Sequence, residues 1–124
     1  MKIWLDDLRP APPTYTRVYL VDEAINEIIR CNRETDFLWK QYTLGYIDRR
    51  LFEKCMKIFT IEEISCDNDL GEGNAEGYKL LDWLEATGRN YPIRIHSANP
   101  VARERMRAII QKNNWKEIQW KGGC

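Results

Sequence analysis

Acidic residues stand at two points where a short apolar run ends in a polar turn. Residues 61–73 read IEEISCDNDLGEG, in which Asp67 and Asp69 follow an apolar segment and precede a glycine. Near the amino terminus, Asp6 and Asp7 follow the run KIWL in the same way. Runs of this kind are typical of strands that end at a turn. Carboxylates in such places either form the turn or hold a metal ion.

Other polar residues end the remaining apolar runs of the chain. His96 and Ser97 stand at the end of YPIRI, and Lys121 follows WKEIQW. A histidine, a hydroxyl and an ammonium can all act on a phosphoryl group, but only if the fold brings them to the acids. The order of strands and helices therefore decides what these residues can do.

The first half of the chain predicts two strands followed by helices. We expect strands at 2–5 and 16–21, separated by DDLRPAPPT, whose three prolines exclude a helix. Asp22 is the expected N-cap of a helix over 23–31, where apolar residues repeat at helical spacing. Residues 32–60 are rich in aromatic and charged residues, and the apolar positions from 51 to 58 suggest another amphipathic helix. We interpret this segment as a helical insertion.

Strands and helices alternate in the second half. We expect a strand at 62–66, a helix at 75–87 closed by Gly88, and a strand at 92–96. Asn99 and Pro100 are the expected N-cap and first residue of a helix over 100–113, and 115–120 is a fifth, edge-like strand candidate. The alternation predicts a single α/β domain over 1–124, with a mostly parallel sheet and helices on its faces.

In an open parallel sheet, ligands bind outside the carboxyl ends of the strands. The acids that follow the first and third strands would meet there with His96, Ser97 and Lys121. Three or four carboxylates would repel one another unless a cation lay between them, and hard oxygen ligands suit Mg²⁺ or Mn²⁺. A hydroxyl and an ammonium beside that cation would complete a site for a phosphoryl group.

Further phosphate-binding candidates flank this edge. Arg9 lies beside the acidic pair, and the backbone N–H groups at Asn99 and after it form a natural anion site at a helix start. Arg103 and Arg105 occupy the first turns of that helix; any of these arginines could hold a phosphate, although most surface arginines are simply solvated. His96, the only histidine, is either a proton donor to a leaving alkoxide or a satisfied structural group.

The order of these residues resembles the receiver domain of response regulators. An acidic pair follows the first strand, an aspartate the third, Ser-Ala the fourth and a lysine the fifth. The first and last receiver helices are missing, because only LRPAPP separates the first two strands and the chain ends at Cys124. The resemblance implies these site residues: Asp6 and Asp7 as a metal-binding pair, Asp67 as phosphoacceptor, the main chain of Asp69 as a further metal ligand, and Ser97 and Lys121 as contacts of the phosphoryl group.

A narrower resemblance is to the cyclic-phosphate-processing receiver-like family. It rests on LDDLRPAP, EEIS-x-D-x-DLG, GY-x-LLDWLE and IRIHSANPVARERM, which cover both ends of the chain and omit only 32–60. The resemblance implies a flavodoxin-like three-layer sandwich and a phosphoester ligand. The residue between the two acids of D-x-D is commonly histidine in that family, and here it is Asn68.

We therefore expect divalent-metal-dependent binding and processing of a phosphoester, such as a cyclic phosphate or cyclic nucleotide, with Asp67 and His96 as catalytic residues. One alternative is a protein that captures a cyclic nucleotide without cleaving it. Asn68 favours this alternative, and so do the aromatic residues of the insertion, which would stack on a base or pack in a core. The other alternative is a degenerate signalling receiver phosphorylated on Asp67.

The composition narrows the environment and the partners. Basic and acidic residues number 19 each, so no broad surface attracts nucleic acid or an anionic membrane. Apolar residues make up 44% and charged residues 31%, as in globular proteins. The four cysteines form no C-x-x-C pair, which argues against zinc, and no signal peptide is recognisable. We expect a cytoplasmic protein with free thiols and a small phosphorylated partner, and oligomers remain open.

Overall fold

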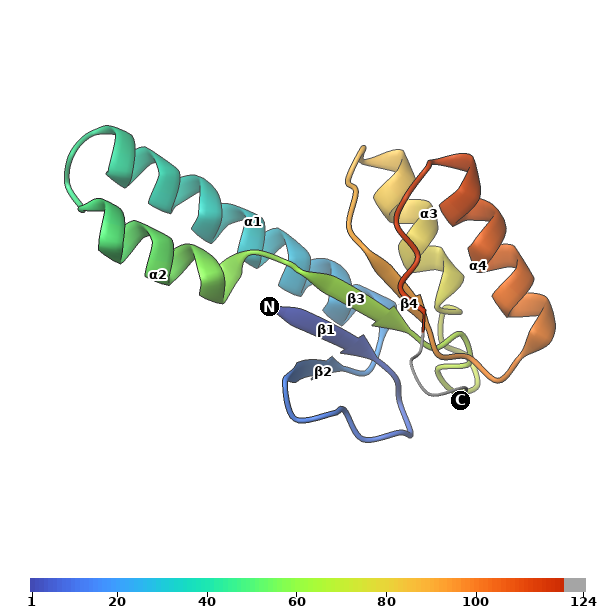
Figure 1. Cartoon of the computed structure of the whole chain (residues 1–124). Coiled ribbons are helices and arrows are strands. Elements are labelled where there is room, and N and C mark those ends of the chain that lie inside the picture. The colour runs from blue at the N-terminus through green and yellow to red at the C-terminus, as the bar shows by residue number, and fades with distance from the viewer. Residues whose placement is uncertain (120–124) are drawn as a thin grey trace.

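The computed structural model describes residues 1–119. Four strands and four helices make up this part of the chain (Figure 1). In chain order they are β1 (Lys2–Leu5), β2 (Tyr15–Val18), α1 (Val21–Thr43), α2 (Arg49–Phe59), β3 (Glu63–Cys66), α3 (Tyr78–Ala86), β4 (Ile93–Ile95) and α4 (Pro100–Lys112). None of these helices is long and apolar enough to span a membrane.

The strands form one sheet in the order β2-β1-β3-β4, and every neighbouring pair is parallel. The predicted α/β class with a parallel, receiver-like sheet is confirmed. Because β1 is central, Lys2 pairs with Tyr15 of β2 on one side and with Glu63 of β3 on the other. All strands run in one direction, so the turns that follow β1 and β3 lie side by side at one edge of the sheet.

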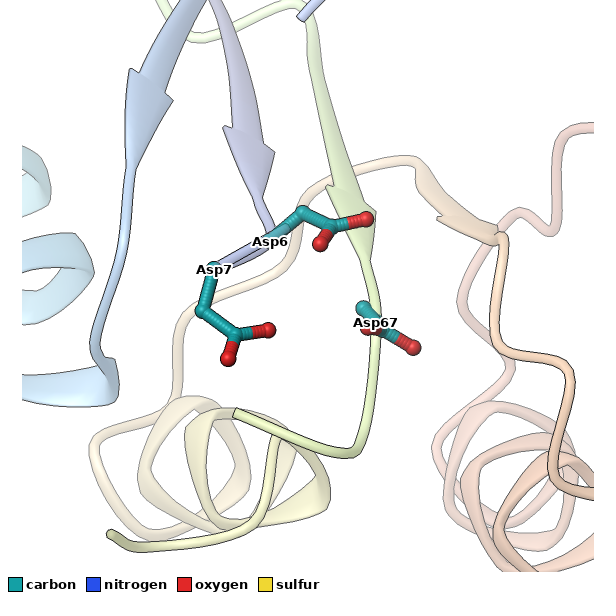
Figure 2. Close-up of side chains that lie close together, drawn as sticks. All are labelled: Asp6, Asp7 and Asp67. Carbon is teal, nitrogen blue, oxygen red and sulfur yellow. The ribbon is translucent and has the colours of Figure 1, made fainter. Parts of the chain in front are cut away.

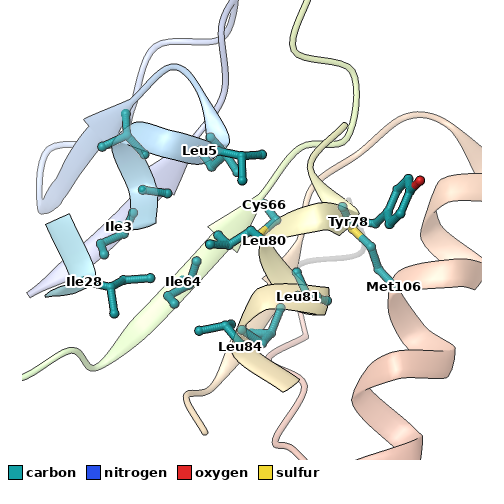
Figure 3. Close-up of a cluster of buried hydrophobic side chains, with 14 of the residues drawn as sticks. Ile3, Leu5, Ile28, Ile64, Cys66, Tyr78, Leu80, Leu81, Leu84 and Met106 are labelled. Atoms are coloured by element: carbon teal, nitrogen blue, oxygen red, sulfur yellow. The ribbon is translucent and has the colours of Figure 1, made fainter. Parts of the chain in front are cut away.

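The hydrophobic core lies between one face of this sheet and α1, α3 and α4 (Figure 3). Alternate strand residues point to that face, namely Ile3 and Leu5 of β1 and Ile64 and Cys66 of β3. The helices cover them with buried apolar side chains: Ala24, Ile28, Leu80, Leu81, Leu84 and Met106. A slip of one residue in the strand pairing would turn the buried set to the other face, so burial fixes the register.

The opposite face of the sheet has no helix within residues 1–119, and this modifies the three-layer expectation. Crossover connections are right-handed, so a helix joining β1 to β2 would have lain on that face. The chain runs there through the proline-containing segment 6–14 instead, and the Trp4 indole donates a hydrogen bond to the Arg9 carbonyl. The first receiver helix is therefore missing, as predicted, and a loop takes its place.

Several predicted boundaries in the first half differ from the structure. Strand β2 covers Tyr15–Val18 rather than 16–21. Asp22 is not an N-cap: α1 begins at Val21 after an extended Leu20, and Asp22 lies in the first turn, where its charge favours the helix dipole. The helix expected to end at residue 31 continues to Thr43, because neither glycine nor proline interrupts 21–43. Residues 32–60, interpreted as a helical insertion, are thus the distal half of α1, the connection at 44–48, all of α2 and the residue after it.

The second half follows the sequence more closely. Gly88 has a left-handed φ of 68° directly after the C-cap of α3, as a terminating glycine requires. Asn99 caps α4 by accepting hydrogen bonds from two backbone N–H groups, and Pro100 is its first residue. The predicted strand at 115–120 is represented by one parallel bridge between Glu117 and Ile93. Lys121 lies outside the described residues.

Candidate functional site

Three carboxylates meet at the carboxyl ends of β1 and β3. One oxygen each from Asp6, Asp7 and Asp67 lies within 4.8 Å of the others (Figure 2). The backbone hydrogen bonds of the parallel sheet continue one residue past β1 and β3, and this positions Asp6 and Asp67. The backbone N–H of Asp6 donates to the Val18 carbonyl, and the backbone N–H of Asp67 donates to the Leu5 carbonyl. We call these three residues the acidic cluster.

Asp6 is fully buried, and the protein holds both of its oxygens. Its Oδ1 accepts hydrogen bonds from the backbone N–H groups of Leu8 and Arg9, each at 2.9 Å. Its Oδ2 lies 3.0 Å from Nε2 of His96. These three partners therefore hold the Asp6 carboxylate in one orientation.

Asp7 is the member of the cluster that the protein does not satisfy. Its Oδ1 is buried and has no hydrogen-bond partner among residues 1–119. Gly71, with φ of 97°, passes so close that an added Cβ would lie 3.4 Å from Asp7 Oδ2. A buried carboxylate oxygen without a partner costs free energy, so this atom is suited to a ligand.

Asp67 has a buried carboxylate beside like charges. Burial raises its pKa above the ordinary value, and the nearby carboxylates of Asp6 and Asp69 act in the same direction. The backbone N–H of Asn68 donates a 2.8 Å hydrogen bond to Asp67 Oδ1. This hydrogen bond and the charge of Arg9 lower the pKa of Asp67. The net effect is a pKa of Asp67 above its ordinary value, as expected for a buried acid beside other carboxylates.

Arg9 supplies the positive charge nearest to the acidic cluster. Its Nη1 lies 3.7 Å from Asp6 Oδ2 and 3.9 Å from Asp67 Oδ1, and it donates a 2.6 Å hydrogen bond to the His96 carbonyl. About half of the Arg9 side chain is exposed. The guanidinium thus borders both the acids and the solvent, where it can meet an anionic ligand.

His96 is locked inside the protein rather than free at the surface. Its Nδ1 lies 2.8 Å from the hydroxyl of Ser65, and its ring stacks on Trp4 with centroids 3.9 Å apart. Burial lowers the pKa of His96 to about 4, a change that Asp6 opposes and Arg9 reinforces. The imidazole is therefore neutral at pH 7, with both nitrogens engaged by protein groups.

Asn68 and Asp69 are not part of the acidic cluster within residues 1–119. The Asn68 side-chain oxygen accepts from the Tyr78 amide at the start of α3, and its amide group donates to Glu76 and Asp69. Asn68 is thus a helix-capping residue in this fold. The Asp69 side chain is not part of the cluster found within residues 1–119.

The remaining predicted ligand residues are at the start of α4. Ser97 is buried, and its Oγ accepts a hydrogen bond from the Asn99 amide at 3.1 Å. The Asn99 side chain occupies the first free N–H groups of α4, so a ligand would compete with this cap. Arg103 is exposed in the next turn, where its charge lowers the pKa of Glu117 as a minor contribution.

Sequence reasoning missed two residues that hold the site, Trp4 and Ser65. They are direct partners in the β1–β3 register and share the face opposite the core. Ser65 alternates with the apolar Ile64 and Cys66, and it is fully buried. This alternation could have been read from the sequence: it predicts that the Ser65 hydroxyl lies on the face of β3 opposite the core.

The donor set of the acidic cluster fits a hard divalent cation. Three carboxylates with one unsatisfied buried oxygen supply the ligands that Mg²⁺ and Mn²⁺ take, together with water. Within residues 1–119 no thiol or free imidazole competes, since Cys66 points into the core and His96 is engaged. The cluster can therefore hold a metal of this class, with Arg9 at its border.

Comparison with known proteins gives the family. The family model of the cyclic-phosphate processing receiver domain matches residues 1–112, which include every element of the described fold from β1 to α4. No curated protein and no solved structure matches the chain. Because the match spans most of the 124 residues, the chain belongs to the cyclic-phosphate processing receiver domain family.

Proposed function

We propose that this protein binds Mg²⁺ or Mn²⁺ at Asp6, Asp7 and Asp67 and, with it, binds and processes a phosphoester such as a cyclic phosphate or cyclic nucleotide. The observation that supports this most directly is the partnerless buried oxygen of Asp7 beside two further carboxylates. When bound, a divalent cation supplies a Lewis acid for a phosphoryl oxygen. The family's name supports the phosphoester as ligand.

The chain's own residues have distinct parts in this proposal. Arg9 borders the acids and is half exposed, so its guanidinium would bind the phosphoryl oxygens. The Ser97 hydroxyl accepts from one amide, and its proton is free to point to the ligand. The main chain of Asp69 would add a metal ligand, and Arg103, Lys121 and the Asn99 cap would contact the ligand's periphery.

Asp67 and His96 are the proposed catalytic pair, but their environments differ. Asp67 retains partial exposure and would act directly at the reacting phosphoryl group. His96 is buried and holds Asp6, so it contributes by fixing a metal ligand in direction. A proton transfer through His96 would require the imidazole to release Ser65 or Asp6.

A second candidate is capture of a cyclic nucleotide without cleavage. The engaged, neutral His96 favours it, and so does Asn68, whose side chain caps α3 instead of facing the acids. A third candidate, a signalling receiver phosphorylated on Asp67, rests on the exposed part of that carboxylate. The three differ in product: a hydrolysed ester, an intact complex or an acyl phosphate.

The test begins with thermal unfolding during titration with Mg²⁺ and Mn²⁺. A cation that binds the folded state raises the unfolding midpoint in a saturable way. We expect this rise in the wild type and its loss in Asp67→Asn. Asp36→Asn is the matched control, because Asp36 is exposed on α1 and the substitution removes the same charge. Absence of a rise in the wild type would refute the metal site.

The wild type with metal is then incubated with cyclic mononucleotides and with a small-molecule phosphodonor. Linear nucleotide as product supports the enzyme, and a saturable complex without product supports capture. Covalent phosphate that is absent from Asp67→Asn supports the receiver. If the protein binds metal but gives none of these three results, the proposal that its ligand is a phosphoester is wrong.

A further inference from the structure

Arg9 connects the carboxyl ends of three neighbouring strands. It lies in the segment after β1, and its Nη1 donates a 2.6 Å hydrogen bond to the carbonyl of His96, the residue that follows β4. Strand β3 lies between β1 and β4 in the sheet, and Asp67 follows it. The same Nη1 lies 3.9 Å from Asp67 Oδ1 and 3.7 Å from Asp6 Oδ2. The guanidinium therefore lies directly beside the acidic cluster.

The backbone of Arg9 is held on both sides. Its N–H donates to Asp6 Oδ1 at 2.9 Å, and its carbonyl accepts a hydrogen bond from the Trp4 indole at 3.3 Å. Trp4 is itself buried and stacks on the His96 ring. Pro10 follows and disfavours helical backbone angles at Arg9. The side chain can change rotamer, but its charge stays within one side-chain length of the acids.

Arg9 and a divalent cation would be like charges beside the same carboxylates. Of the three acids that can hold the metal, Asp6 and Asp67 also lie within 4.0 Å of Arg9 Nη1. Both carboxylates are buried, and charges interact more strongly where water is excluded. A metal that binds alone must therefore bind against the charge of Arg9, or the guanidinium must leave the acids.

An anionic ligand reverses this effect. A guanidinium carries several N–H donors, and within residues 1–119 only Nη1 of the Arg9 side chain donates a hydrogen bond. About half of the side chain is exposed, so its other donors can meet a ligand from the solvent side. A phosphoryl group bound to both the metal and Arg9 is attracted by each of them and lies between their charges.

We propose that Arg9 couples metal binding to phosphoester binding. Its charge keeps the affinity for the metal alone low, and it stabilises the complex in which metal and phosphoryl group are both bound. The protein then holds the cation firmly only when a phosphorylated ligand is present. The coupling rests on the proposed function, since it takes the acidic cluster as the metal site and a phosphoryl group as the ligand.

Arg9→Gln tests the coupling, because the glutamine amide removes the charge and keeps a hydrogen-bond donor. Free Mn²⁺ is measured by electron paramagnetic resonance during titration, with and without inorganic phosphate. Without phosphate, we expect the variant to bind Mn²⁺ about tenfold more tightly than the wild type does. Phosphate should raise Mn²⁺ affinity in the wild type, and this factor should be at least about fivefold smaller in the variant. A gain of metal affinity cannot result from a loss of structure.

Three further variants separate the position of the charge from its sign. Arg33→Gln removes an exposed charge from α1 and should change neither affinity. Arg17→Gln removes a charge closer to the site, because Arg17 Nε donates to the main-chain carbonyl of Asp6 at 3.3 Å. It should change Mn²⁺ affinity by less than about twofold, since Arg17 does not contact the carboxylate. Arg9→Lys keeps the charge and should retain the Mn²⁺ affinity of the wild type.

Each component of the proposal can fail separately. Mn²⁺ binding that is unchanged or weaker in Arg9→Gln would overturn it, and an equal gain in Arg17→Gln would assign the effect to net charge instead. A wild type that binds Mn²⁺ and phosphate independently of each other refutes the coupling and leaves the metal site intact. A wild type that binds no Mn²⁺ with or without phosphate refutes the metal site and the coupling together.

Discussion

The Nε2 atom of His96 lies 3.0 Å from Oδ2 of Asp6, and both side chains are almost completely buried. An ionised carboxylate only accepts hydrogen bonds, so Nε2 carries the proton and Nδ1 accepts from the Ser65 hydroxyl. This tautomer follows from the hydrogen-bond network. The chain Ser65–His96–Asp6 thus turns a carboxylate of the candidate metal site toward its neighbours, in the way that outer residues orient metal ligands.

The protonation state of His96 can be measured directly, because the protein has one histidine. We expect the imidazole ¹⁵N signals of a neutral ring with the proton on Nε2 at pH 7. Burial lowers the pKa of His96 to about 4, so the signals should stay unchanged down to about pH 5. Titration near pH 6.5 would show that the ring is solvated and would return His96 to the role of proton donor.

Removal of the Ser65 hydroxyl should weaken the metal site without touching a metal ligand. In Ser65→Ala, Nδ1 loses its donor, and the ring can adopt the other tautomer, which no longer donates to Asp6. We expect the affinity for Mn²⁺ to fall about tenfold, as for other outer partners of metal ligands. The ¹⁵N signals of His96 should change in the same variant.

Thr16→Ala is the control for that experiment, because Thr16 is an exposed hydroxyl residue on β2. It should leave both the affinity and the His96 signals as they are in the wild type. If Ser65→Ala alters the signals but not the affinity, the geometry stands and the orienting role of the chain is wrong.

The buried imidazole also makes stability depend on pH. The pKa of His96 is about 4 in the folded chain, and the ordinary value is 6.5. Below pH 6.5 the unfolded chain therefore binds a proton at this residue that the folded chain does not bind. The free energy of unfolding should therefore be complete above pH 6.5 and decrease as the pH falls toward 4. By pH 5 the loss should be roughly 2 kcal/mol.

Chemical unfolding from pH 7.5 to 5 in the presence of EDTA measures this effect. His96→Gln is the comparison, because its amide can donate to Asp6 and accept from Ser65 without titrating. Asp67 contributes in the opposite direction, since its pKa is raised and its stabilisation is lost as the pH rises. The difference between the two proteins isolates His96, and equal pH profiles would contradict its low pKa.

The convergence of the acids was predictable from the sequence, because it needs only the order of the elements. Once β1 and β3 are parallel neighbours, residues just after them must meet at one edge, and Asp6 and Asp67 occupy those positions. Local signals also sufficed at Asn99 and Gly88, where a cap and a left-handed turn have chemical requirements that few residues meet.

The surroundings of His96 were predictable only in part: alternation along β3 placed Ser65 on the face opposite the core, but its neighbours there depend on strand register. Trp4 and Ser65 are neighbours because the register of β1 and β3 makes them partners. Neither strand's own sequence specifies that register. The prediction of Asp22 as the N-cap was wrong. Aspartate is a common capping residue, but α1 begins at Val21 and its N-cap is Leu20, which is extended.

Asp7→Asn should give opposite changes without and with metal. Three carboxylates whose oxygens lie within 4.8 Å repel one another, so neutralising the unpartnered one should raise the unfolding midpoint in EDTA. The same change removes a ligand, and the rise on adding Mn²⁺ should disappear. A midpoint that falls in EDTA would mean that Asp7 is a structural residue, whereas Asp36→Asn should change neither value.

Gly77 joins the stability of α3 to the geometry of Asp67. A Cβ added at Gly77 would lie 1.8 Å from the Asp67 carbonyl oxygen, and the Gly77 amide donates to the Asn68 carbonyl at 2.8 Å. The obstacle is backbone, which cannot rotate away, so Gly77→Ala must push α3 and the residues after β3 apart. We expect a loss of about 3 kcal/mol in the free energy of unfolding and a loss of Mn²⁺ binding.

Gly45→Ala separates this clash from the general cost of replacing a glycine. Gly45 has a left-handed φ of 82°, but an added Cβ would meet no atom within 4 Å in residues 1–119. Its replacement should cost only about 1 kcal/mol and leave Mn²⁺ affinity unchanged. If Gly77→Ala is destabilised yet binds Mn²⁺ normally, Asp67 keeps its place when α3 moves, and the acidic cluster is held by the sheet alone.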